Sequence, residues 1–86
     1  MERDMSLLRT HILESYPDET FVFADGFDGA IIGVDESSMR IIYSVYRCLS
    51  ILADDMSMDD AIEYFDFNVS CSYVGEKTPI WCRDNF

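Results

Sequence analysis

Paired carboxylates are the residues of this chain best suited to chemistry. The segment Asp25-Gly26-Phe27-Asp28-Gly29 places two of them around a glycine-rich turn, an arrangement that could ligate a metal ion or supply a general acid and base. It lacks the alternating ligands and the distal Glu of an EF-hand loop, and no nucleophile or oxyanion motif accompanies it. Turn formation explains the segment better. A small metal-dependent enzyme that uses Asp25 and Asp28 is the less favoured alternative.

The cysteines and the single histidine form no recognisable site in the sequence. Cys48, Cys71 and Cys82 are an odd number without a CxxC pair, which argues against both a disulfide framework and a zinc site. We expect them to be reduced and to pack as small apolar side chains. His11 lies at the edge of an apolar helical stripe and is expected at the helix surface. The sequence therefore predicts no catalytic residue, no metal and no cofactor.

The acidic residues are unevenly distributed. Seven of the 17 lie between Arg9 and Arg40 and seven between Arg47 and Lys77, and no Lys or Arg interrupts either stretch. Such clustering is typical of an anionic surface that engages a basic protein groove, including one that normally holds DNA. An ordinary solvated acidic face is the alternative, and the sequence leaves both open.

The sharpest acidic cluster is expected on a helix over residues 57–68. Helical spacing places Asp59, Glu63 and Asp66 on one face, where each like-charged pair costs roughly 0.2–0.5 kcal/mol. Interspersed lysines would have been more stabilising, so we predict that these three acids bind a cationic partner. Asp25 and Asp28 are the next candidates for partner binding.

Composition limits the class of protein. The chain is 49% hydrophobic and 14% aromatic, enough apolar surface for a single folded domain over residues 1–86. A formal net charge of −11 repels phosphate backbones and anionic lipid, so we expect no direct nucleic-acid binding and no membrane binding. No apolar run of about 18 residues and no signal-peptide core is present, which predicts a cytoplasmic protein.

Apolar periodicity and turn residues predict an α+β fold. Helices are expected over residues 4–15, with Asp4 or Ser6 as the N-cap and Met5, Leu8, Ile12 and Tyr16 as the apolar stripe, and over residues 45–55, with Ser44 as the N-cap. A third helix is expected over residues 57–68, with Ser57 as the N-cap and a buried apolar stripe formed by Met58, Ala61, Ile62, Phe65 and Val69. A polar turn is expected at residues 35–38. Strands are expected over residues 20–25, 30–34 and 40–43, forming a small antiparallel sheet, and residues 80–82 can add an edge strand. The helices would cover one face of the sheet.

Two structural questions stay open at this level. The second sheet face is covered either by the first helix or by another subunit in a homodimer. The aromatic residues Tyr64, Phe67, Tyr73 and Trp81 belong either to the core or to an interface hot spot, where such side chains carry much of the binding energy.

Three segments resemble a known group of proteins: FADGFDGAIIG at residues 23–33, EYFDFN at 63–68 and YVGEKTPIW at 73–81. Together they resemble a family of small acidic proteins of bacteriophages and prophages. The resemblance implies a phage anti-defence protein of the anti-BREX kind, which binds and inhibits a host restriction protein, such as its ATPase, without catalysis. It assigns no binding residues, and a DNA mimic or a structural or regulatory phage protein is the alternative.

Overall fold

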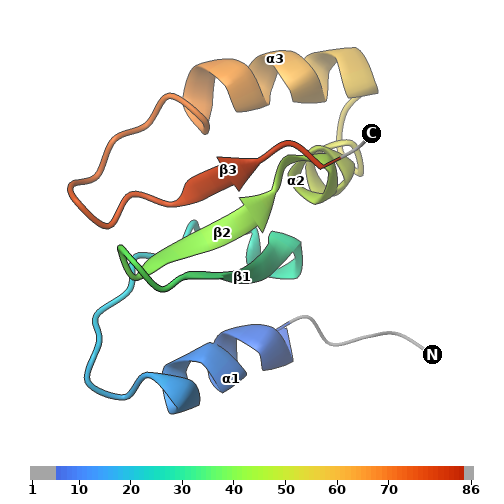
Figure 1. Cartoon of the computed structure of the whole chain (residues 1–86). Helices are drawn as coiled ribbons and strands as arrows, with labels where there is room; N and C mark the ends of the chain where they lie inside the picture. Colours follow the sequence, from blue (N-terminus) through green and yellow to red (C-terminus); the bar gives the residue numbers. More distant parts are fainter. Residues whose placement is uncertain (1–5, 85–86) are drawn as a thin grey trace.

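The computed structural model describes residues 6–84. Along the chain the elements are α1 (Ser6–Ser15), the short 3₁₀ helix η1 (Asp28–Ala30), β1 (Ile31–Asp35), β2 (Arg40–Ser44), α2 (Val45–Leu52), α3 (Met58–Asn68) and β3 (Ile80–Cys82) (Figure 1). The predicted α+β class, with three α-helices and a three-stranded sheet, is confirmed for these residues.

The sheet has the strand order β1-β2-β3. β1 and β2 form an antiparallel hairpin, whereas β3 pairs in parallel with the other side of β2, with Trp81 opposite Tyr43. The sheet is therefore mixed rather than wholly antiparallel. The last pair is parallel because the chain crosses over through α2 and α3 before it returns as β3. The predicted edge strand at residues 80–82 is confirmed.

The hairpin turn is organised by Asp35. Its carboxylate accepts hydrogen bonds from the Ser37 backbone N–H (3.1 Å), the Ser37 hydroxyl (2.8 Å) and the Ser38 hydroxyl (2.9 Å). These bonds favour the charged form, led by that from the Ser37 side chain, and lower the pKa of Asp35. The turn closes with Met39 at a φ of 54°, the left-handed region that ends many hairpin loops.

Residues 20–25 were predicted as a strand, and this prediction was wrong. They have no strand partner, and residues 21–24 are all partly buried instead of alternating between core and solvent. The Ala24 N–H donates to the Tyr43 hydroxyl (2.6 Å), and Phe23 lies beneath the guanidinium of Arg9 at 4.2 Å. Side chains rather than a neighbouring strand therefore hold this segment, and the hairpin forms one segment later in the chain.

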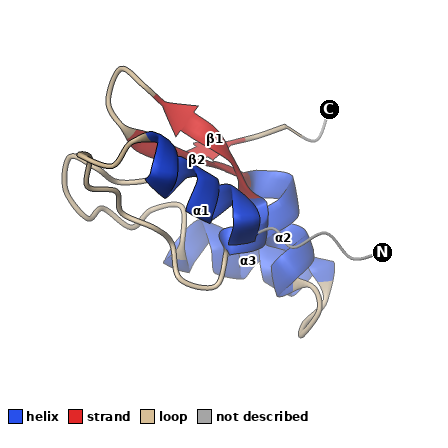
Figure 2. Cartoon of the chain, turned by 90° about the horizontal axis from the view of Figure 1, so that it is seen from below, coloured by secondary structure: helices blue, strands red, loops and turns tan. Residues whose placement is uncertain are grey.

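Helices lie on both faces of the sheet (Figures 1 and 2). α1 packs against β1 and η1 on one face, and α2 and α3 lie on the other. Of the two predicted covers for the second face, α1 therefore covers part of it. The cover is incomplete, because a shallow groove remains between α1 and the sheet, lined by Ile42, Ile80, His11 and Glu36 among others.

The structure describes α1 from Ser6 to Ser15, which covers the predicted range except residues 4 and 5. The predicted cap Asp4 and the apolar residue Met5 lie outside the described residues. Leu8, Ile12 and Tyr16 pack on the core as the stripe requires, with Ile12 5% exposed. The predicted helix is therefore confirmed from residue 6 onward.

Serine side chains begin α2 and α3. The Ser44 hydroxyl accepts from the Arg47 N–H (3.0 Å), and the Ser57 hydroxyl accepts from the Asp60 N–H (3.1 Å). Each bond satisfies a backbone donor that the first helical turn leaves free. Both predicted caps are confirmed, although α2 ends at Leu52, three residues before its predicted end.

The core lies between the sheet and the helices, with buried residues from α1, η1, β1, β2, α2 and α3. Tyr43 and Phe65 are fully buried, and their ring centroids lie 5.1 and 5.4 Å from that of Trp81. Phe65 meets the Trp81 ring edge-on, an arrangement that aromatic pairs favour. This contact ties α3 to β3 and fixes which side of α3 faces solvent.

Candidate functional site

The side of α3 opposite the core carries the predicted partner-binding acids. Asp59, Glu63 and Asp66 are all exposed, and the helix contains no Lys or Arg. The Asp66 carboxylate lies 3.6 Å from the Arg83 guanidinium, in an ion pair that is itself largely exposed. Within residues 6–84, neither Asp59 nor Glu63 forms an ion pair. Helix geometry therefore brings these three predicted residues together.

An aromatic side chain lies among these acids. Phe67 is 71% exposed, and it follows Glu63 by one helical turn and Asp60 by two. We call the set of Asp59, Asp60, Glu63, Asp66 and Phe67 the α3 outer face. Aromatic side chains are enriched in protein interfaces relative to the rest of the protein surface.

The apolar stripe of α3 is narrower than its sequence predicts. Ala61 and Phe65 are fully buried, but Met58 and Ile62 are 44% and 42% exposed. The helix is the outermost element, so it is covered only along the line where Ala61 permits close approach and Phe65 reaches the sheet. The predicted burial of Met58 and Ile62 was wrong for this reason.

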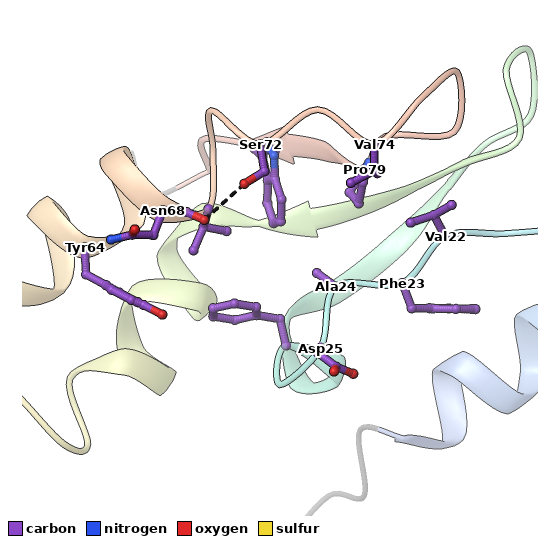
Figure 3. Close-up of a pocket in the computed structure, with 12 residues that line it drawn as sticks. Val22, Phe23, Ala24, Asp25, Tyr64, Asn68, Ser72, Val74 and Pro79 are labelled. Atoms are coloured by element: carbon purple, nitrogen blue, oxygen red, sulfur yellow. Dashed lines mark hydrogen bonds between the residues drawn. The ribbon is translucent and has the colours of Figure 1, made fainter.

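A pocket of about 260 Å³ lies beside α3. Figure 3 shows Tyr64 and Asn68 of α3 on one side of it and the segment that carries Val22 and Ala24 on the other. The chain that leaves α3 closes the upper rim through Ser72, whose hydroxyl donates to the Asn68 carbonyl (3.1 Å). The pocket therefore lies between α3 and the segment that was predicted as a strand.

Trp81 lines the same pocket and carries an unsatisfied donor. Its indole N–H is buried and has no hydrogen-bond partner within residues 6–84, a situation that costs about 1–3 kcal/mol. Trp81 is otherwise partly buried and packs against the core, whereas Tyr64, Phe67 and Tyr73 are 41%, 71% and 78% exposed. Of the four aromatic residues left open by the sequence, one packs against the core and three are available at the surface.

The two remaining candidates, Asp25 and Asp28, have separate surroundings. Asp25 is exposed and lines the pocket opposite Tyr64. Asp28 accepts hydrogen bonds from Arg9 at both carboxylate oxygens (3.1 and 3.2 Å). Asp25 therefore lies at the pocket, whereas Asp28 faces α1 and already has a cationic partner. A metal ion at Asp28 would have to displace Arg9.

The three cysteines are free, and they differ in environment. Cys48 is fully buried, and burial raises the pKa of its thiol to about 12. Cys71 is exposed, with its thiol 3.0 Å from the Phe67 carbonyl, so its predicted packing role was wrong. Among residues 6–84, no three His, Cys, Asp or Glu side chains converge as metal ligands would.

Sequence reasoning missed the pocket because its walls come from three stretches of the chain, residues 22–27, 64–74 and 79–81. The one available signal was the run of four consecutive apolar residues at 21–24, which does not alternate as a strand with one solvated face should. Such a run indicates a segment with contacts on more than one side.

Comparison with protein-family models, curated proteins and solved structures found no match to this chain. The resemblance to small acidic phage proteins therefore rests on its three sequence segments. None of the helices formed by residues 6–84 has the length and apolar character needed to cross a membrane.

Proposed function

We propose that this chain is a non-catalytic binding protein that inhibits a host restriction or defence protein by engaging a basic surface of it. The observation that carries the proposal is the α3 outer face, where exposed acids surround the exposed ring of Phe67 on a helix without a base. The arrangement combines a charged rim with an apolar centre, as many protein interfaces do.

The two kinds of side chain have different tasks in this proposal. Exposed carboxylates attract a basic partner over distance and raise the association rate, an effect that salt screens. The Phe67 ring supplies contact area that is largely insensitive to salt, as aromatic hot-spot residues do. Binding should therefore weaken with salt without disappearing.

The biological role rests on the resemblance to small acidic phage proteins. On that basis the target is a component of a host restriction system, such as a BREX ATPase, and the protein acts in the host cytoplasm. The net charge of −11 supports a partner that is a basic protein rather than nucleic acid or an anionic membrane.

The test is capture of the partner from host cells by tagged variants. Glu63→Lys changes the charge by two units on the α3 outer face, and Glu14→Lys makes the same change at an exposed position of α1. We expect one defence-system protein to be retained stoichiometrically by wild type and Glu14→Lys, to be lost from Glu63→Lys, and to be retained in smaller amount by wild type at high salt. Equal retention by both variants would contradict the proposal.

A DNA mimic that occupies a nucleic-acid enzyme is the second candidate, favoured by the row of carboxylates along α3. Competition separates the two modes. Duplex DNA displaces a mimic from its target, whereas an inhibitor that binds outside the nucleic-acid site stays bound. A homodimer would use the groove between α1 and the sheet, and sedimentation equilibrium measures it directly.

A further inference from the structure

The pocket beside α3 has the size of one side chain. A cavity of about 150 Å³ with apolar walls can hold a benzene molecule, whereas drug-sized ligands and cofactors occupy about 300–1,000 Å³. At about 260 Å³, this pocket matches an isolated aliphatic or aromatic group better than a whole cofactor. Its walls are mostly apolar and include Val22, Ala24 and Trp81.

We propose that the pocket binds one bulky apolar side chain of a peptide segment whose neighbouring residues are Lys or Arg. This inference rests on the proposed function, because the segment belongs to the basic partner that the α3 outer face engages. It adds a second contact, in which an apolar anchor enters the pocket while the flanking cations remain at its acidic rim.

Charge complementarity selects a basic segment. Asp25 lines the pocket, and Asp60 lies one helical turn before the lining residue Tyr64, with Glu63 adjacent to it. No Lys, Arg or His is among the lining residues, so no side chain of the wall repels or competes with an incoming cation. The same carboxylates would repel an acidic segment, so such a segment would not bind at this face.

The exposed parts of the wall select a macromolecular partner. Tyr64 and Val74 line the pocket and are 41% and 56% exposed, and Tyr73 beside Val74 is 78% exposed. These rings and methyl groups extend the apolar surface beyond the opening. A peptide chain on either side of the anchor would cover them, whereas a small molecule confined to the cavity would leave them in water.

The pocket also contains its own reporter. Trp81 is the only tryptophan of the chain, so its fluorescence and its single indole N–H resonance both report on the wall. A segment that enters the pocket changes the surroundings of this ring, whereas a segment held only by the acids of α3 leaves them as they are.

The experiment uses heptapeptides without tryptophan: GKRLKRG, its alanine form GKRAKRG and its charge-reversed form GEELEEG. Binding of each peptide to the full chain is measured by isothermal titration calorimetry, and entry into the pocket is followed in parallel by Trp81 emission. We expect GKRLKRG to bind about tenfold more tightly than GKRAKRG, because only the leucine side chain is removed from water. GEELEEG should not bind.

Substitutions that fill the pocket test whether the leucine side chain of the peptide binds there. Ala24→Leu adds bulk from one wall and Ser72→Met from the opposite rim, and Ser50→Leu is a matched control at an exposed position of α2. We expect the preference for leucine to disappear in both filling variants and to persist in Ser50→Leu. Circular dichroism establishes whether each variant is folded. Two filling positions are used so that the test stays informative if one of the variants does not fold.

Several outcomes would overturn the inference. Equal affinities for the leucine and alanine peptides, or a preference that survives in both filling variants, would show that the pocket is not used. Equal affinities for the two peptides that fall with salt would contradict the use of the pocket but would still be consistent with binding at the α3 outer face and with the proposed function. A change in Trp81 emission with protein concentration alone would assign the pocket to a second copy, and absence of binding by both basic peptides would also contradict the inference.

Discussion

The Nη1 atom of Arg9 lies 3.1 Å from the Oδ2 atom of Asp28, and this ion pair joins α1 to η1. The same guanidinium lies over the Phe23 ring, 4.2 Å from its centroid. One side chain thus holds α1, the segment before η1 and η1 itself together. The acid that resembled a metal ligand or a partner-binding residue in the sequence has a structural contact in the folded chain.

We expect the Arg9 and Asp28 pair to make a modest contribution to stability. Both side chains are more than a third exposed (41% and 35%), so solvent screening limits their coupling to about 0.5–1 kcal/mol. A double-mutant cycle with Arg9→Met and Asp28→Asn, measured by urea unfolding, gives this coupling directly. Arg9→Met should cost more than Asp28→Asn, because it also removes the contact with Phe23. Additive effects of the two substitutions would show that the ion pair contributes nothing.

Two phenylalanines of α3, two residues apart, should respond oppositely to truncation. Phe65 is fully buried against Trp81, whereas Phe67 is 71% exposed. Phe65→Ala should lower the free energy of unfolding by about 3–5 kcal/mol through lost burial and the cavity that remains. Phe67→Ala should change it by no more than about 0.5 kcal/mol and weaken capture of the partner. Retention of full partner binding by Phe67→Ala would remove Phe67 from the proposed interface.

The junction between β2 and α2 depends on one buried hydroxyl. Ser44 is fully buried, accepts from the Arg47 N–H and donates to the Asp84 carboxylate (2.8 Å). We expect Ser44→Ala to cost about 1–2 kcal/mol, because it removes the helix cap and leaves both partners without a bond. The exposed cap Ser57 is the matched control, and Ser57→Ala should cost about 0.5–1 kcal/mol. Thermal unfolding of the two variants compares them, and a larger loss for Ser57→Ala would contradict this reasoning.

Local signals in the sequence were sufficient for most elements of the fold. The serine caps, the apolar stripe of α1 and the polar turn residues 35–38 act over a few positions, so each could be recognised without knowledge of the rest of the chain. The exposed acids of α3 were predictable for the same reason, because Asp59, Glu63 and Asp66 share a face in any helix with this register.

The errors concern contacts between segments distant in sequence. The β propensity of residues 20–25 is high, but this segment contacts Tyr43 and Arg9, which are distant in sequence. No local sequence pattern predicts these contacts, and tertiary packing overrode the propensity. The parallel pairing of β3 likewise depends on the path of α2 and α3. The pocket could not be predicted because it exists only where residues 22–27, 64–74 and 79–81 meet.

The buried thiol of Cys48 should make the stability of the protein sensitive to alkaline pH. Its pKa in the folded protein is raised to about 12 by burial, from an ordinary value of 9.0. Between these values the unfolded chain loses the proton while the folded chain keeps it, so the folded state binds more protons and the free energy of unfolding falls as pH rises. The contribution is fully present below about pH 9 and is lost toward pH 12, with a slope of at most about 1.4 kcal/mol per pH unit. Burial also raises the pKa of Tyr43, which lowers the free energy of unfolding further above pH 10.

Urea unfolding of wild type and Cys48→Ala from pH 8 to pH 11 separates the contributions of Cys48 and Tyr43, since Tyr43 is present in both proteins. We expect the alanine variant to be less stable at pH 8 but to lose stability less steeply, and parallel curves would show that the thiol does not titrate as proposed.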